Sequence, residues 1–136
     1  MIPIYRAKKI DSDEYVFGVP RQDSKGFYEM IINTCEDGVC GVIQRYIDST
    51  TLSIHFPDML DSQGNKIFAS LQEDGKGGDI FIWENETFIA WFDNIALTVN
   101  ATNKDNFECS CHDSLHEWYE GSIEKYNIKV IGIQND

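Results

Sequence analysis

Four cysteines and two of the three histidines are the residues of this chain whose types suit metal binding or nucleophilic catalysis. They are Cys35, Cys40, Cys109, Cys111, His112 and His116. Zinc prefers thiolate and imidazole ligands, and four of them in tetrahedral positions close a structural site. Neither cysteine pair has the C-x2-C spacing of a zinc knuckle, because the spacings are C-x4-C and C-x-C. We therefore predict no metal site, and a Cys/His zinc-binding module stays as an alternative interpretation.

The same cysteines could also form disulfides or act as nucleophiles. A disulfide within either pair needs an oxidising compartment, whereas a reducing cytoplasm favours free thiols. A cysteine nucleophile needs a histidine base within hydrogen-bond reach and a third group that orients the base. Cys111, His116 and Asp113 supply those types, but no motif selects them. We therefore expect free thiols, no catalytic residues and a protein that is not an enzyme.

A glycine-rich segment, Asp74–Asp79, superficially resembles a phosphate-binding loop. It reads D-G-K-G-G-D, lacks the G-x4-G-K-[ST] pattern and does not run into a predicted helix. We interpret Gln72–Gly78 as a flexible surface loop, because its glycines leave the backbone free to move. We predict no bound cofactor.

The chain is strongly acidic. It carries 23 Asp and Glu against 11 Lys and Arg, a formal net charge of -12. Phosphate backbones and anionic lipid surfaces are bound by Lys and Arg, so this balance argues against nucleic-acid and membrane partners. An acidic surface favours solubility, and it also attracts a basic protein partner. An alternative function is an acidic mimic of DNA that inhibits a host DNA-binding protein.

Length and apolar content fit a single folded domain over residues 1–136. Apolar residues make up 42% of the chain, which is typical of a globular protein and not of a disordered one. A subdivision into residues 1–56 and 57–136 is the alternative. No apolar run approaches the roughly 20 residues that a membrane helix needs, and the N-terminus shows no secretory signal. We therefore expect a cytoplasmic protein.

The most apolar part of the chain, Gly78–Val99, predicts the central structural element. Its runs Ile80–Trp83 and Phe88–Phe92 are typical of two strands of a hairpin that turns at Asn85-Glu86. The residues then predicted to face each other are Trp83 and Phe88, Ile82 and Ile89, and Ile80 and Trp91. Both faces would be apolar, which predicts a hairpin covered on both sides.

Shorter apolar or alternating runs predict the other strands. These strands are Ile2–Lys8, Tyr15–Val19, Phe27–Asn33, Val39–Ile47, Leu52–Phe56, Lys66–Leu71 and Ile128–Ile133. Polar segments with turn-forming residues predict the connections between them. These connections are Ile10–Glu14, Pro20–Gly26, Cys35–Gly38, Asp48–Thr51, Asp61–Asn65 and Asn100–Asn106. In Val39–Ile47 the alternation of Val42, Gln44 and Tyr46 with Ile43, Arg45 and Ile47 predicts one partly wet face.

Ser114–Tyr126 is the one predicted helix. Ser114 and Glu117 form a capping box, and an apolar stripe with helical spacing follows it. Together these elements predict a mainly β fold, a small antiparallel barrel- or sandwich-like domain with one short helix near the C-terminus.

Several segments together resemble the signatures of one family. Asp61–Phe68, followed by Gly78-Asp79-Ile80, is similar to the D-x-x-G-x-x-I-[YF]…G-D-I signature of YopX-like phage and prophage proteins. The tail Ile128–Ile133 is similar to that family's closing V-I-G-N-I. The opening Tyr5-Arg-Ala7 with Tyr15–Gly18 resembles its F-R-A…W-x-x-G hairpin.

The resemblance implies a mainly β protein with a small barrel-like part, encoded by a bacteriophage or a bacterial genome. It implies no catalytic residue, because the family has no established activity. Gly64 and Gly78 would then serve turns, and Asp61 and Asp79 would bond to turn backbone. Gly132 would mark a bulge or close packing.

The chain departs from the family's pattern around its signature. His55–Met59 replaces an aromatic-Thr-Gly lead-in, and Ala69–Gly77 are extra residues, so the role of the 69–78 loop stays open. We expect a non-enzymatic accessory protein of phage or prophage origin, located in the cytoplasm of a bacterial host. It would act by binding a macromolecule, with a protein as its partner. Exposed strand edges would also allow oligomers.

Overall fold

The computed structural model describes residues 3–57, 59–93, 98–106, 113–114 and 128–135. Its strands are β1 (Ile4–Lys9), β2 (Tyr15–Gln22), β3 (Tyr28–Glu36), β4 (Val39–His55), β5 (Ala69–Ser70), β6 (Asp79–Trp83), β7 (Glu86–Asp93), β8 (Thr98–Asn103), β9 (Asp113–Ser114) and β10 (Lys129–Ile133). A 3-10 turn, η1 (Lys104–Asn106), follows β8. The predicted mainly β class is confirmed. Of the predicted helix, Ser114 lies in β9, and 115–126 fall outside the described residues.

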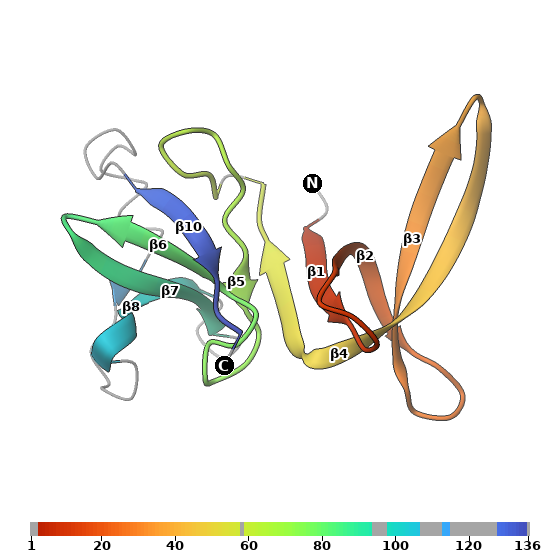
Figure 1. Ribbon diagram of the computed structural model, residues 1–136, viewed down its shortest axis with the longest axis horizontal. Helices are drawn as coiled ribbons and strands as arrows, with labels where there is room; N and C mark the ends of the chain where they lie inside the picture. Colours follow the sequence, from red (N-terminus) through yellow and green to blue (C-terminus); the bar gives the residue numbers. More distant parts are fainter. Residues whose placement is uncertain (1–2, 58, 94–97, 107–112, 115–127, 136) are drawn as a thin grey trace.

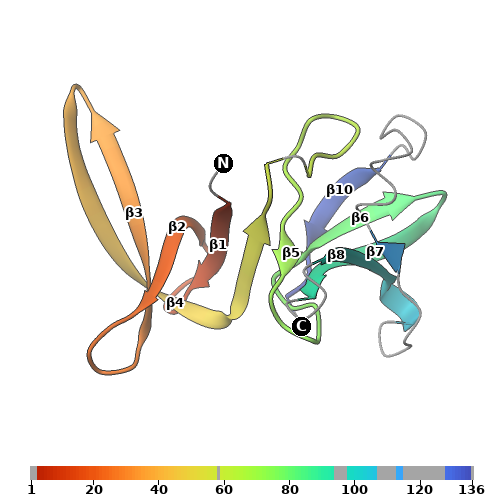
Figure 2. The same ribbon diagram turned by 180° about the vertical axis from the view of Figure 1, so that it is seen from behind.

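The strands form one branched sheet with two lobes (Figures 1 and 2). Hydrogen-bonded neighbours run in the order β1-β2-β3-β4-β5-β7-β6-β10, with β8 on β7 and β9 on β8. β4 also pairs with β1, which closes β1 to β4 into a small ring. The pairing of β5 with β7 is parallel, and the other described pairings are antiparallel. The first lobe is therefore the barrel-like ring, and β5 to β10 form the second.

β4 belongs to both lobes because it is one long strand of 17 residues. It pairs first with β3 and then with β1 and β5. The turn predicted at Asp48–Thr51 is therefore wrong. The segment is a bulge, since the register with β1 shifts between Arg6 and Lys8. Asp48 accepts hydrogen bonds from Thr50 through its carboxylate and from Thr51 through its carbonyl. These bonds stabilise a bend within the strand instead of a reversal of the chain.

Two groups of buried apolar side chains fill the lobes. The group inside the ring consists of Ala7, Met30 and Ile47, with Tyr5, Val16, Ile32 and Leu52 packed against it. The larger group belongs to the second lobe and includes Ile54, Met59, Ile67, Phe81, Phe88, Val99 and Ile128. Tyr5 packs against both groups. The two lobes are therefore in direct apolar contact.

β6 and β7 form the predicted central hairpin, but with a different turn. The turn residues are Glu84-Asn85, both with positive φ, in place of Asn85-Glu86. Phe81 therefore faces Phe88, and the predicted facing pairs are wrong by a slip of two residues. A two-residue slip keeps every side chain on its predicted face. The hairpin was predicted to be covered on both faces. The face that carries Ile82 is only partly covered, because Ile82 is 37% exposed.

Two predicted loops are partly strands. β2 continues through Pro20, which is tolerated because β1 pairs with β2 only as far as Gly18 and leaves that edge open. β8 extends to Asn103, although its sequence is polar. Its buried Thr102 accepts a hydrogen bond of 2.9 Å from the indole of Trp91. Such pairing makes a polar strand stable inside the lobe.

The residues matched to the family signature mostly have the structural roles expected of them. Asp61 accepts hydrogen bonds from the amides of Gln63 and Asn65, around Gly64 with a φ of 83°. The register of β10 with β6 shifts between Val130 and Gly132, so Gly132 borders a bulge.

A buried ion pair, which we call the joint, connects the two lobes. Nη2 of Arg6 in β1 lies 2.9 Å from Oδ1 of Asp79 in β6, and both residues are buried. The same guanidinium nitrogen donates to the carbonyl of Gly77 at 2.8 Å. The second oxygen of Asp79 accepts from the amide of Phe68 at 2.8 Å. Burial raises the pKa of Asp79, and the charge of Arg6 opposes that shift. Asp79 therefore joins two lobes, whereas a turn-bonding role was expected.

Small residues make room for the joint. In register, Ser53 lies beside Arg6 and Ser70 lies beside Ser53, and both serines are fully buried. Gly77 has a φ of 84°, and a Cβ there would lie 2.0 Å from the carbonyl oxygen of Thr51. The amide of Gly77 donates to the carbonyl of Gln134 at 2.7 Å. The prediction of a flexible surface loop at Gln72–Gly78 is therefore wrong, because this loop is packed on the sheet and holds Arg6.

Gly78 was expected to serve a turn, and it serves close packing instead. A Cβ at this position would lie 2.3 Å from the carbonyl oxygen of Ala90 and 3.0 Å from Cβ of Ser70. Its φ is outside the left-handed region, in contrast to that of Gly77. The Gly-Asp pair of the signature thus brings the loop against the sheet and places the carboxylate of the joint.

Asp79→Asn tests the joint. The substitution preserves size but leaves the charge of Arg6 buried and uncompensated, so we expect the free energy of unfolding to fall by about 3 kcal/mol. Urea denaturation measures the change. The matched control is Glu14→Gln, which removes the exposed pair between Lys9 and Glu14 and should lower stability by less than about 1 kcal/mol. If both variants lose the same free energy of unfolding, the joint stabilises the protein no more than an exposed ion pair does.

Candidate functional site

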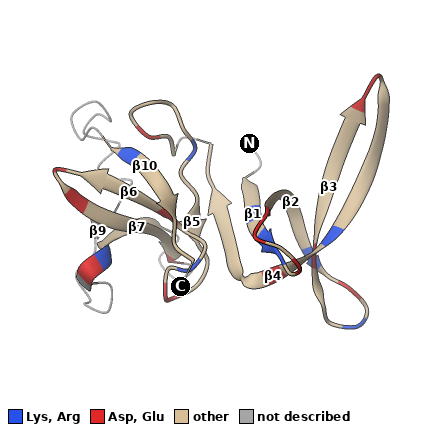
Figure 3. Cartoon of the chain, viewed as in Figure 1, with Lys and Arg blue, Asp and Glu red and all other residues tan. Residues whose placement is uncertain are grey.

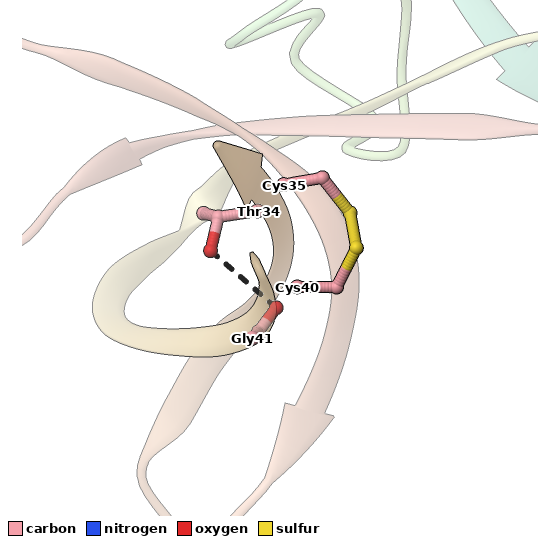
Figure 4. Close-up of a disulfide and its surroundings, with 4 residues drawn as sticks. All are labelled: Thr34, Cys35, Cys40 and Gly41. Carbon is pink, nitrogen blue, oxygen red and sulfur yellow. Dashed lines mark hydrogen bonds between the residues drawn. A yellow bond between two sulfur atoms is a disulfide. The ribbon is translucent and has the colours of Figure 1, made fainter. Parts of the chain in front are cut away.

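The structure brings one pair of the candidate ligands together, as a disulfide. Cys35 and Cys40 face each other across β3 and β4 and are covalently bonded (Figure 4). The expectation of free thiols is therefore wrong for this pair. The other candidates, Cys109, Cys111, His112 and His116, fall outside the described residues. Among the residues that are described, no group of His, Cys, Asp or Glu is arranged to hold a metal ion.

The buried polar side chains near the joint are occupied by structural hydrogen bonds. The hydroxyl of Ser53 donates to the carbonyl of Arg6, and that of Ser70 donates to the carbonyl of Lys76 at 2.7 Å. Nδ1 of His55 lies 3.0 Å from the carbonyl of Ile67, which can only accept, so this nitrogen carries the proton. These groups stabilise the fold, and the described residues show no nucleophile paired with a base.

His55, like Asp79, is a group near the joint whose pKa is shifted, so its titration affects stability. Desolvation lowers its pKa, and the bond to the carbonyl of Ile67 opposes this shift only in part. Lys66 lowers the pKa further, whereas Asp79 raises it. The imidazole is therefore held neutral in the folded protein.

A two-stranded projection of the described structure is largely exposed to solvent. β3 and β4 continue past the last residue that pairs with β2, which is Ile31, and form a ribbon over residues 31–44 that we call the arm. Figure 1 shows the arm extending away from both lobes. Its ladder ends at the turn Asp37-Gly38, where both residues have positive φ (51° and 80°). Asp-Gly favours this type of two-residue turn, so the predicted turn is confirmed.

The disulfide stabilises the tip of the arm. Cys35 and Cys40 form the second residue pair from the turn, after Glu36 and Val39, and their Cα atoms are 4.1 Å apart. The hydroxyl of Thr34 bonds to the carbonyl of Gly41 on the neighbouring strand (Figure 4). An isolated two-stranded ribbon is only marginally stable in water. A cross-link that closes so short a loop contributes about 2 kcal/mol, which is a large share of what holds the tip together.

The two faces of the arm and its base differ in their surroundings. One face continues into the core of the ring and carries Met30 and Ile47. The opposite face carries a cluster of apolar side chains that we call the outer face. Its residues are Val19, Phe27, Ile31, Val42 and Tyr46.

The outer face is exposed although it is apolar. Val42 is 61% exposed, Val19 55% and Tyr46 52%. The rings of Phe27 and Tyr46 lie 6.2 Å apart in an edge-on contact. Register places Val19 and Ile31 side by side, with Val42 on the next strand. Polar residues of the same face interrupt this cluster: Gln44 lies opposite Ile31, and Glu29 lies opposite Tyr46. Exposed apolar side chains gathered on one face are nevertheless typical of a protein-binding surface. The outer face is thus the candidate functional site.

The sequence contained one signal for this site. The alternation within Val39–Ile47 predicted one partly wet face without selecting it, and in the structure Val42, Gln44 and Tyr46 are exposed. It could not show that Val19 lies beside them, since that neighbour comes from β2.

Comparison with known proteins finds no match to this chain, whether against family models, curated proteins or solved structures. Within the part of the chain that is described, no helix is long and apolar enough to cross a membrane.

Acidification should destabilise the protein through His55. Its folded pKa is lowered, so the unfolded chain binds the proton more readily and stability falls as pH drops below about 6.5. Urea denaturation between pH 7.5 and 5 measures this loss. In His55→Gln the free energy of unfolding should depend less on pH over the same range. Parallel curves for both proteins would assign the pH dependence to other groups.

Reduction of the disulfide should loosen the tip of the arm while leaving the lobes intact. We expect amide hydrogen exchange in residues 32–43 to become about thirtyfold faster with reductant, the equivalent of about 2 kcal/mol. Amides of β6 and β7 should keep their protection. The double variant Cys35→Ser/Cys40→Ser should exchange like the reduced protein and should not respond to reductant. Exchange in the arm that is unaffected by reductant would contradict this role.

Proposed function

We propose that this protein is an accessory protein of phage or prophage origin that acts without catalysis, by binding another protein through its outer face. The main observation that supports this function is that the outer face is apolar and exposed and belongs to a projecting arm. Its phage origin rests on the resemblance to YopX-like proteins. The buried polar groups that could suggest chemistry are engaged in holding the lobes together.

Charge favours a basic partner. The formal net charge is -12, and the segment from Tyr28 to Gln44 contains Glu29, Glu36 and Asp37 but no Lys or Arg. Glu29 is paired with Arg21 at 2.7 Å, which leaves the two acids at the tip exposed to solvent. A partner with apolar and basic side chains would therefore complement the arm.

A DNA mimic would need acidic groups arrayed along one face at the spacing of phosphates. In Figure 3 the acidic residues of the described chain lie scattered over turns and strand ends of both lobes and at the tip of the arm. Among the residues that the structure describes, the acids therefore do not form the array that mimicry of DNA would need.

The binding surface can be tested with matched threonine variants. Val19→Thr/Val42→Thr keeps β-branched side chains but makes the outer face more polar. The control is Val39→Thr, which changes a valine that is 75% exposed but lies on the opposite face. A protein that wild type captures from host lysate should bind the double variant about tenfold more weakly or worse, and should bind the control unchanged.

Two outcomes would overturn the proposed function. One is capture that is equally strong for the double variant and wild type. The other is the absence of any enriched partner in repeated trials together with turnover of a small molecule by the purified protein.

A further inference from the structure

The arm has an unpaired backbone edge along β4. β1 first meets β4 at Ile47, opposite Lys9, and the carbonyl of Tyr46 accepts a bond from Ile10. Residues 39–45 of β4 therefore pair with β3 on one side only. Figures 1 and 2 show β4 on the side of the arm that faces away from both lobes.

The register identifies which backbone groups of this edge point outward. The two-residue turn makes Glu36 and Val39 a hydrogen-bonded pair, and alternate pairs then direct their amides and carbonyls away from the ladder. The short Cα separation of Cys35 and Cys40 agrees with this alternation. The outward groups of β4 therefore belong to Cys40, Val42 and Gln44. Within the described structure, the Gln44 carbonyl accepts from Arg45, and the groups of Val42 have no recorded partner.

The residues with outward backbone groups also present their side chains on the outer face, because both properties alternate with the same period. If a strand were added to this edge in antiparallel orientation, every second one of its side chains would lie on the outer face, the face that carries Val42. Edges of this kind are normally protected by Lys, Pro or a bulge. Residues 39–44 contain none of these, and Arg45 is the first basic residue.

We propose that the β4 edge of the arm binds an extended segment of the partner protein by antiparallel strand addition, and that this segment alternates apolar and basic side chains. This inference rests on the proposed function and specifies its partner. Apolar side chains of the segment would lie against Val42 on the outer face, and its basic side chains would be attracted to Glu36 and Asp37 at the tip. A second copy of the chain fits less well, since each copy carries a net charge of -12.

The test uses a capped synthetic octapeptide that alternates valine and lysine, with binding followed by fluorescence anisotropy at physiological salt. Gln44→Pro removes an outward amide from the β4 edge, whereas Asn33→Pro removes an outward amide from the β3 edge. We expect Gln44→Pro to weaken binding at least tenfold and Asn33→Pro to leave it within twofold. Equal affinity for both variants would overturn the inference.

A second experiment changes the peptide and leaves the protein unchanged, so its result does not depend on the folding of a variant. Methylation of the valine amides of the peptide should abolish binding, because those amides would face β4. Methylation of the lysine amides should leave binding intact, since they would point to solvent. Equal binding of both methylated peptides, or of a peptide with glutamate in place of lysine, would overturn the inference.

Two further measurements, self-association and partner capture, distinguish failure of this inference from failure of the proposed function. Dimerisation of the wild type in sedimentation, lost in Gln44→Pro, would identify a second copy as the occupant and overturn the inference. If Val19→Thr/Val42→Thr loses the captured partner while Gln44→Pro retains it, the edge is not used, and the proposed function still holds. If both variants retain the partner, the proposed function fails as well.

Discussion

The buried pair of Arg6 and Asp79 is the interaction on which the arrangement of the two lobes depends. Two charges removed from water stabilise a fold only if their remaining hydrogen-bonding capacity is satisfied. Here the carbonyl of Gly77, the amide of Phe68 and the aromatic rings over the guanidinium carry out most of that task. Among the described groups, Nε of Arg6 has no hydrogen-bond partner. The small residues around the joint follow from this constraint, since larger ones would separate the charges.

The polar groups of the body and those of the arm are used in opposite ways. Around the joint, hydroxyl, imidazole and carboxylate groups bond inward, and the Gln72–Gly78 loop closes over them. On the arm, apolar side chains and backbone groups are directed to solvent. The proposed function assigns recognition of another protein to the arm and leaves the body to hold the arm in place.

Local patterns predicted most of the strands and several turns, because those features depend on neighbouring residues. The Asp37-Gly38 turn and the Asp61–Asn65 turn are examples. What failed depended on distant residues. Gln72–Gly78 looked flexible because its packing partners, Arg6 and Thr51, lie far away in the chain. The same limit applies to the outer face, which needs β2.

Two further errors have local causes. The slip in the central hairpin arose because the sequence alone did not show that Glu84 adopts positive φ. Cys35 and Cys40 were expected to be free because of the compartment assigned to the protein. The turn between them brings the two residues opposite each other whatever the compartment, so the two sulfur atoms lie within bonding reach.

The shared strand β4 has a consequence for how this protein can evolve. Val42 at one end serves the outer face, and Ser53 at the other lies under the joint, on a single unbroken strand. Insertion or deletion of one residue between them would turn one of the two sites to the wrong side of the sheet. The bulge at Asp48–Thr51 is the one stretch between them in which a change of length could be absorbed. Homologues should therefore vary in length there or in the loops, and hold the remainder of β4 constant.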